Sequence, residues 1–371
     1  MNPFISKTNS TPQDTPSFIK SCLIGLLVFI ILFIGLEFGY RTALLNDFLP
    51  VRSIGSYHTQ FELKLFKLRD YVAKYGGVDV IIIGNSMVNT GIIPGEIANE
   101  YESSTGNQLR IFNFGIEGLT ISPISDISQY LADKYHPGTL LVFTEMRDYV
   151  HNNGEETEET FDDNAWIQNQ LGNWSIEGTI ADHSYALQHL LSLRNWSRYD
   201  FLDSYNLAYN RLNAISETGY EEDSYTATTN SLMREPDPSN VQDAILFKEY
   251  QNYKMALDRI EDLKNILALQ NEGTKVILSE MPVYPSYFIY FGDARVRQKY
   301  LTTLNRIANQ SHSLFVPPVN PSIIPLDGRS DNHHLNYKGA PIYSEALGVQ
   351  LGSLCSQRGI CLNYATGPTT P

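Results

Sequence analysis

Four short runs of β-branched and aromatic residues constrain the fold of this 371-residue chain most strongly. They are VDVIIIGNSM, QLRIFNFG, GTLLVFTEM and GTKVILSEMP, which begin at residues 78, 108, 138 and 273. Their apolar residues are continuous, which is typical of parallel strands buried on both faces. The segments that flank these runs have apolar residues at helical spacing. One of them is LFKLRDYVAKYGG at 65–77, where the glycine pair predicts a helix end. The alternation predicts an α/β fold with a parallel sheet.

An uncharged apolar stretch near the N-terminus predicts a membrane helix. No residue from Ser21 to Leu36 is charged, and the stretch with its flanks predicts one transmembrane anchor at residues 18–40. Lys20 must then extend its amine to the interface. A cleaved signal peptide is the alternative, but the absence of a small-x-small cleavage site after Leu36 favours an uncleaved anchor. Residues 1–17, rich in Ser, Thr and Pro, predict a disordered tail.

Charge does not decide the orientation of this helix. Lys7 and Lys20 precede it, whereas Arg41 and Arg52 follow it, so the positive-inside rule gives no direction. The short polar tail and two late cysteines favour a single-pass protein with its bulk domain outside the cytoplasm.

Composition argues against two classes of ligand. The net charge of −14 and the pI near 5.0 disfavour nucleic acid, because phosphate binding needs clustered Lys and Arg. The three cysteines lack the spacing of a zinc site, so no metal site is expected. Cys355 and Cys361 either close a small disulfide loop in an oxidising compartment or remain two thiols.

The main α/β domain, predicted over residues 55–371, changes its pattern between residues 150 and 240. An acidic run, EETEETFDD at 155–163, precedes the three tryptophans Trp166, Trp174 and Trp196. We expect an insertion here, either a peripheral subdomain with an ordinary aromatic core or a cap whose aromatic rings line a carbohydrate or acyl groove. Beyond it, YQNYKMALDRIEDLKNILALQNEG predicts one long amphipathic helix that ends at Gly273.

Two distant segments carry residues suited to nucleophilic catalysis. Ser86 follows the first predicted strand, which would place its hydroxyl at the carboxyl edge of the sheet and at a helix start. Asp331 and His334 are three residues apart, close enough for the carboxylate to orient an imidazole that serves as the base. Taken singly, Ser86 could be only an N-cap and the Asp331 segment only a surface turn, with His333 as a competing imidazole.

Together these segments resemble the SGNH (GDSL-like) serine hydrolase family. GNSM at 84–87, NFGIEG at 113–118 and D-x-x-H-L-N-x-x-G at 331–339 are similar to its first, second and fifth blocks, within residues 78–350. The first block departs from Gly-Asp-Ser by carrying Asn85. The resemblance implies a three-layer, flavodoxin-like parallel sheet.

It also implies the roles of individual residues. Ser86 is the expected nucleophile, His334 the base and Asp331 its supporting carboxylate. The backbone N–H groups of Ser86 and Gly118 are expected in the oxyanion hole. No cofactor is implied.

The third block departs most from the family pattern. TEMRDY places Arg147 where the family has an asparagine that donates to the oxyanion. A guanidinium can supply that donation with charge assistance. Alternatively, Arg147 forms a structural ion pair with Glu145 or Asp148.

The resemblance extends to cell-surface members that remove or transfer acyl groups on envelope polymers, including those similar to the D-alanyl transfer protein of teichoic acid synthesis. It implies a membrane-anchored esterase or O-acyltransferase, with an acyl donor, a carbohydrate or polymer acceptor and a membrane acyltransferase as candidate partners. Water or a sugar hydroxyl would resolve the acyl-enzyme. A non-catalytic binding or assembly component that keeps the fold is the alternative, supported by the altered third block and the aromatic insertion.

Overall fold

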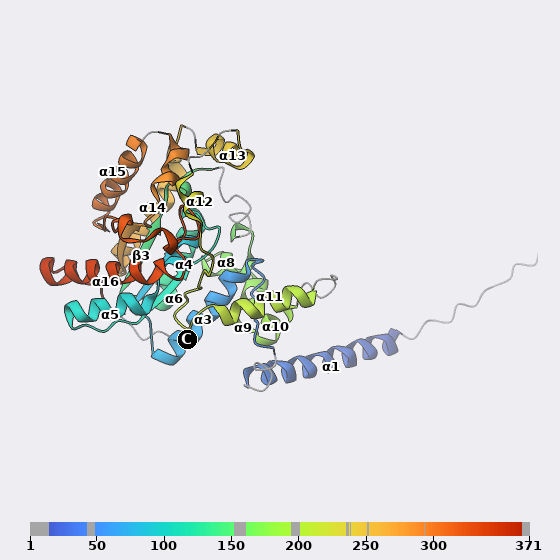
Figure 1. The fold of residues 1–371 in the computed structure, drawn as a ribbon. Helices are drawn as coiled ribbons and strands as arrows, with labels where there is room; N and C mark the ends of the chain where they lie inside the picture. The colour runs from blue at the N-terminus through green and yellow to red at the C-terminus, as the bar shows by residue number, and fades with distance from the viewer. Residues whose placement is uncertain are drawn as a thin grey trace, which may run out of the picture.

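A five-stranded, all-parallel sheet forms the centre of the molecule (Figure 1). The computed structural model describes residues 15–42, 49–151, 161–193, 201–234, 237, 239–250, 252–292 and 294–365. The strands are β1 (Val80–Gly84), β2 (Ile111–Gly115), β3 (Thr139–Thr144), β4 (Lys275–Glu280) and β5 (Leu314–Phe315), in the order β2-β1-β3-β4-β5. The four predicted strands and the α/β class are therefore confirmed. β5 was not predicted, because a two-residue strand at the sheet edge has too short an apolar run to stand out.

Helices pack around this sheet. They are α3 (Thr59–Tyr75), α4 (Ser86–Gly91), α5 (Pro94–Thr105), α6 (Ile121–Tyr135), α14 (Leu257–Ala268), α15 (Ala294–Gln310) and α16 (Gly339–Arg358). α5 packs on α16, and α6 packs on α14. Because β2 and β3 lie on opposite sides of β1, right-handed crossovers place α5 and α6 on opposite faces of the sheet. α3 ends at Gly76 in the left-handed conformation, as its glycine pair predicted.

Between β3 and β4 the described residues form helices and loops but no strand of the sheet. The helices are η1 (Met146–Tyr149), α8 (Ala165–Gln170), α9 (Ile176–His183), α10 (Tyr185–Ser192), α11 (Phe201–Ala214), α12 (Thr229–Met233) and α13 (Val241–Tyr250). The loop after α11 returns to the sheet, where the Thr218 carbonyl accepts from the Asn113 N–H at 2.8 Å. The boundary of an insertion at 150–240 remains a prediction.

The tryptophans of this region differ in their surroundings. Trp166 is buried in the main core, where its ring lies 5.0 Å from that of Tyr130 and 6.2 Å from that of Phe61. Trp174 is 71% exposed. Trp196 and most of the acidic run lie outside the described residues. Trp166 thus packs in the core, and its buried ring also borders a cavity of about 590 Å³.

The prediction of one long helix that ends at Gly273 is wrong about where that helix begins. α13 ends at Tyr250, and the chain passes through Asn252 with a φ of +61° before α14 begins at Leu257. The Ala256 N–H donates to the Tyr149 carbonyl at 2.9 Å, so a tertiary hydrogen bond replaces the helical one. The predicted end holds, because Gly273 is left-handed after the short helix η2 (Leu269–Glu272).

The N-terminal apolar stretch forms α1 (Thr15–Arg41), which projects from the rest of the chain in Figure 1. Among the described residues it is the one helix long and apolar enough to cross a membrane, over Phe18–Arg41. Its length and composition fit either a membrane anchor or a signal sequence. The disordered tail predicted at 1–17 falls mostly outside the described residues, although 15–17 belong to α1.

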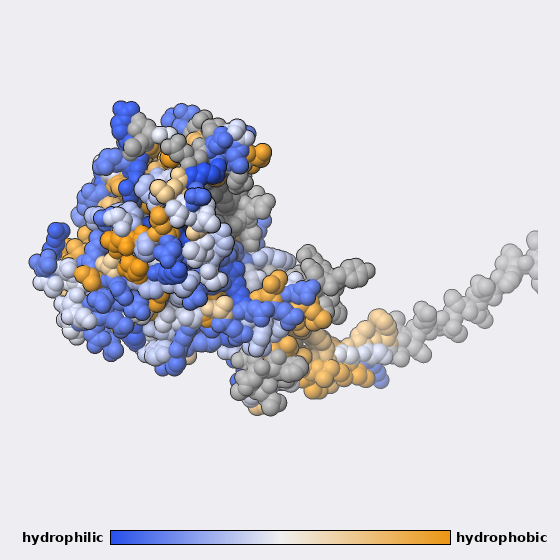
Figure 2. Space-filling model, in the orientation of Figure 1, coloured by the Kyte–Doolittle hydropathy of each residue, from blue (hydrophilic) through white to orange (hydrophobic). Residues whose placement is uncertain are grey.

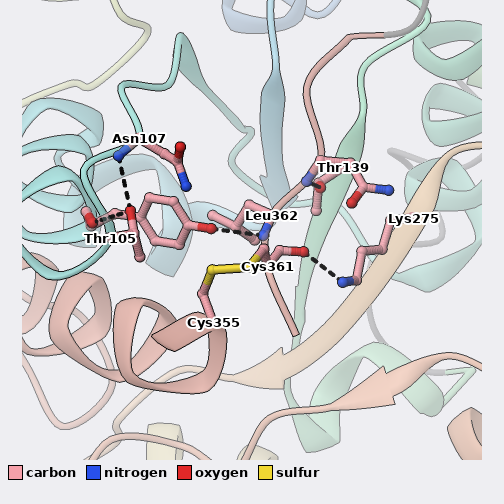
Figure 3. Close-up of a disulfide and its surroundings, with 9 residues drawn as sticks. Thr105, Asn107, Thr139, Lys275, Cys355, Cys361 and Leu362 are labelled. Carbon is pink, nitrogen blue, oxygen red and sulfur yellow. Dashed lines mark hydrogen bonds between the residues drawn. A yellow bond between two sulfur atoms is a disulfide. The ribbon is translucent and has the colours of Figure 1, made fainter. Parts of the chain in front are cut away.

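The two late cysteines form a disulfide, Cys355–Cys361 (Figure 3). It turns the chain back from the end of α16 toward the amino ends of the strands. There Lys275 Nζ donates to the Cys361 carbonyl at 2.6 Å, and the Leu362 N–H donates to the Tyr101 hydroxyl at 2.9 Å. The crosslink therefore holds the C-terminal segment at the edge of the sheet opposite Ser86.

Candidate active site

Ser86 lies where β1 passes into α4. Asn85 is the N-cap of α4, and its side-chain oxygen accepts from the Met87 N–H at 3.0 Å. Gly84 and Gly115 allow α4 to pack closely on the strand ends. A Cβ on Gly84 would lie 2.5 Å from Val88, and one on Gly115 would lie 2.4 Å from the Asn89 nitrogen. The turn thus presents the hydroxyl of Ser86 at the carboxyl edge of the sheet.

His334 and Asp331 lie beside this hydroxyl. Ser86 Oγ is 2.8 Å from His334 Nε2, and His334 Nδ1 is 2.7 Å from Asp331 Oδ2. A carboxylate only accepts hydrogen bonds, so it fixes the proton of neutral His334 on Nδ1 and leaves Nε2 to accept from the Ser86 hydroxyl. The structure therefore brings together Ser86, His334 and Asp331 in the order of a nucleophile, a base and an orienting acid.

The loop that carries Asp331 fixes this arrangement locally. Asp331 Oδ1 accepts from the backbone N–H groups of His333 at 2.8 Å and of His334 at 2.7 Å. Burial alone would raise the pKa of Asp331, but the two imidazoles and these hydrogen bonds hold it well below its ordinary value. Asp331 therefore remains ionised beside the imidazole. The Tyr284 N–H ties the loop to the chain after β4 by donating to the Asn332 carbonyl at 2.8 Å.

His333 does not occupy the position of the base. Its ring centroid lies 4.0 Å from that of His334, and its Nδ1 lies 3.0 Å from Asn332 Oδ1 and 3.1 Å from Asp331 Oδ1. Burial, and then the neighbouring His334, lower the pKa of His333 to about 3. The structure pairs His334, and not His333, with Ser86.

Gly118 and Arg147 are the two other residues that the sequence placed in the oxyanion hole. Gly118 lies in the exposed turn after β2 with a φ of +75°, at the same sheet edge as Ser86, because β1 and β2 are paired with Gly84 opposite Gly115. Arg147 Nη2 donates to Glu145 Oε1 at 2.8 Å. Of the two alternatives for Arg147, the ion pair with Glu145 is the contact observed.

A buried network underlies Ser86. Asn85 Nδ2 donates to Glu145 Oε1 at 2.8 Å and to Asp148 Oδ1 at 3.1 Å, and Tyr287 donates to the other oxygen of Glu145. Burial, and then the charge of Glu145, raise the pKa of Asp148 well above its ordinary value. Burial would also raise the pKa of Glu145, but the charges and hydrogen bonds around it, of which the charge of Arg147 is the largest, outweigh burial and lower that pKa. Glu145 is therefore the ionised member of the pair.

Sequence reasoning did not place Asn85, Asp148 and Tyr287 in this network. Part of it had a signal, since Glu145 directly follows a buried strand and Asp148 comes three residues later, which places both near the sheet edge that carries Asn85. Tyr287 had none. It comes from η3 (Pro285–Phe291), whose approach to Glu145 depends on tertiary packing.

One group of side chains has the composition of a metal site. Donor atoms of Asp331, His333 and His334 lie within 4.8 Å of one another. Asp331 and His334 already hydrogen-bond each other, and His334 Nε2 is directed at Ser86. The arrangement thus fits orientation of an imidazole better than convergence of three ligands on one ion.

One cavity adjoins the triad at Asp331. An open cavity of about 520 Å³ is lined by Asp331, Asn332, Tyr225 and Arg234, among others. A second cavity, of about 590 Å³, lies between residues 54–57, the start of α8, α9 and α10, and its lining includes no triad residue. The first is the better candidate for a substrate site, because it reaches the loop that carries Asp331.

Comparison with known proteins does not extend this description. No family model matches the chain, and no curated protein matches it. The geometry of Ser86, His334 and Asp331 is therefore the basis for a functional proposal.

Proposed function

We propose that this chain is a membrane-anchored, SGNH-like serine esterase or O-acyltransferase. The observation that carries the proposal is the 2.8 Å separation of Ser86 Oγ and His334 Nε2, with Asp331 on the other imidazole nitrogen. A lone serine at a helix start is usually a cap, but here the capping side chain is that of Asn85. The hydroxyl of Ser86 is thereby left for the imidazole.

The arrangement of the sheet supports the same proposal. The order β2-β1-β3-β4-β5 is the flavodoxin-like order, in which ligands bind at the carboxyl ends of the strands where the order reverses. That reversal lies at β1, the strand that leads to Ser86. This fits the fold implied by the SGNH resemblance.

The proposed reaction is a two-step acyl transfer. Ser86 Oγ attacks the ester carbonyl while His334 Nε2 takes its proton, and the proton then passes to the departing alcohol. Water or a sugar hydroxyl next attacks the acyl-enzyme, loses its proton to His334 and releases Ser86. The N–H groups of Ser86 and Gly118 are the proposed oxyanion donors, with Arg147 as a candidate third donor.

The proposed location is the outer face of a membrane. The apolar span of α1 and the Cys355–Cys361 disulfide support an anchored domain in an oxidising compartment. An acyl donor and a carbohydrate or envelope polymer as acceptor fit that location, and a membrane acyltransferase is a candidate partner.

A fluorophosphonate probe tests the proposal directly, because it phosphonylates an activated serine. The full chain in detergent should be labelled, whereas Ser86→Ala and His334→Ala should not. Ser103→Ala is the matched control that keeps labelling, because it removes an exposed serine hydroxyl from α5. An unlabelled wild-type protein with native circular dichroism would favour the non-catalytic binding component.

A further inference from the structure

The last turns of α1 are joined to α10 by several polar contacts. Glu37 accepts hydrogen bonds from Ser184 Oγ at 3.0 Å and from the Ala186 N–H at 2.9 Å, so a side chain of α1 binds the start of α10. Arg41 Nη2 donates to the His183 carbonyl at 2.8 Å. α10 is thereby held at the end of the apolar span, where α1 would leave the hydrocarbon region.

Aromatic contacts strengthen this junction. The Tyr40 ring stacks on the buried His189 ring with centroids 4.0 Å apart, and the Arg41 guanidinium lies 4.7 Å from the Tyr185 ring centroid. Helix α1 is therefore not a tether that allows the domain to swing freely. Its end is packed on the domain.

The helices around this junction expose large apolar side chains to solvent. Together with Trp174, in the loop just before α9, we call them the α9–α11 face: Trp174, Ile176, Ile180, Leu190, Leu202 and Leu207. Each is between 46% and 71% exposed. In Figure 2 hydrophobic residues gather over α10 and α11, next to the apolar surface of α1. Exposed apolar area of this kind marks an interaction surface.

We propose that the α9–α11 face inserts into the interfacial region of the lipid bilayer that α1 crosses, and so holds the domain against the membrane. The proposal rests on the proposed anchoring by α1. We expect lipid to cover this face, because the face lies next to the C-terminal end of α1, where the apolar span of that helix ends, and continues its apolar surface. Tryptophan beside aliphatic residues is typical of such interfaces.

Charge sets a further expectation. The chain carries a net charge of −14, and Glu177 and Asp203 lie on α9 and α11 beside the exposed apolar residues. We therefore expect burial of apolar side chains, rather than attraction to anionic headgroups, to hold the face at the membrane. Insertion should occur in zwitterionic phosphatidylcholine and should persist at high salt.

Site-directed fluorescence on the full chain tests the proposal. In a Cys22→Ser background, single cysteines at Ile176→Cys and Leu207→Cys are labelled with an environment-sensitive fluorophore and reconstituted in phosphatidylcholine nanodiscs. Val349→Cys is the matched control, because Val349 is an exposed apolar residue on α16. We expect a blue shift and quenching by brominated lipid at 176 and 207, and neither at 349.

Three results would overturn the proposal. Probes at 176 and 207 that remain as aqueous as the probe at 349 would show an undocked face. A blue shift without quenching by brominated lipid would mean that a second copy covers the face. Release of the chain from membranes by carbonate would remove the anchoring on which the docking rests. Fluorophosphonate labelling of the same samples reports on Ser86 separately, so loss of docking and loss of the proposed activity are distinguishable.

Discussion

The side-chain amide of Asn85 donates a 2.8 Å hydrogen bond to the buried carboxylate of Glu145, directly beneath the proposed nucleophile. The same amide nitrogen donates to Asp148, while its oxygen caps α4. An amide suits this position because its N–H group can donate hydrogen bonds to both carboxyl groups. An aspartate there would add a third carboxyl group to the cluster.

We therefore predict that Asn85→Asp, which would create the usual Gly-Asp-Ser sequence of the SGNH family, destabilises this chain. The free energy of unfolding should fall by about 3 kcal/mol, because the variant removes the amide donor from two buried carboxyl groups and buries a third beside them. Denaturant titration measures this change. Asn305→Asp, on an exposed position of α15, is the control and should change stability by less than about 0.5 kcal/mol. Equal stability of both variants would contradict the network.

Asp331→Asn should slow the reaction of Ser86 without unfolding the protein. The amide cannot fix the proton of His334 on Nδ1 as the carboxylate does, so the rate of fluorophosphonate labelling should fall by about 10²–10⁴-fold. A labelling time course measures the rate. Asp327→Asn changes an exposed carboxylate four residues away, paired with Lys338, and should label at the wild-type rate. A normal rate in Asp331→Asn would rule out the orienting role.

Arg147→Met should lower stability by about 3 kcal/mol, because it leaves the buried Glu145 carboxylate without its cation. Arg147→Lys should recover part of the loss by keeping the positive charge. Thermal unfolding compares the two variants. If Arg147 serves only this ion pair, folded Arg147→Lys should label within about tenfold of wild type; a loss of about 10²–10³-fold would instead indicate donation to the oxyanion.

The double substitution Cys355→Ser/Cys361→Ser should reduce stability by about 2 kcal/mol, the loop-closure contribution expected for cysteines six residues apart. Reductant should lower the Tm of wild type and leave that of the double variant unchanged. Cys22→Ser removes the exposed free cysteine and should behave as wild type. A wild-type Tm that does not respond to reductant would show that the crosslink does not stabilise the C-terminal segment.

The buried carboxyl group of Glu280 makes the free energy of unfolding depend on pH. Burial raises its pKa to about 7, although Arg297 at 2.7 Å opposes the shift. Because the folded state binds this proton more tightly than the unfolded state, the associated stability is complete below about pH 4.3 and is lost as pH rises through 7. Relative to Glu280→Gln, wild type should lose on the order of 3 kcal/mol across that window. Urea titrations at several pH values measure it, with exposed Glu345→Gln as the control that retains the loss.

The sequence predicted the elements whose signals are local. Continuous apolar runs identified β1 to β4, and the glycines at 76 and 273 marked helix ends. The pairing of Asp331 with His334 was also predictable, because three residues span one turn of chain. Cys355 and Cys361 were near enough to pair, although spacing could not decide that they do.

Tertiary structure decided the contacts that join distant segments. Ser86 and His334 are 248 residues apart, and they meet only because the loop before α16 returns to the end of β1. Packing likewise chose Glu145 as the partner of Arg147, brought Tyr287 to the same carboxylate and broke the helix expected before Gly273. Periodicity in a sequence reports whether a residue faces the core. The identity of its neighbour depends on strand order and on the packing of helices, which no single segment encodes.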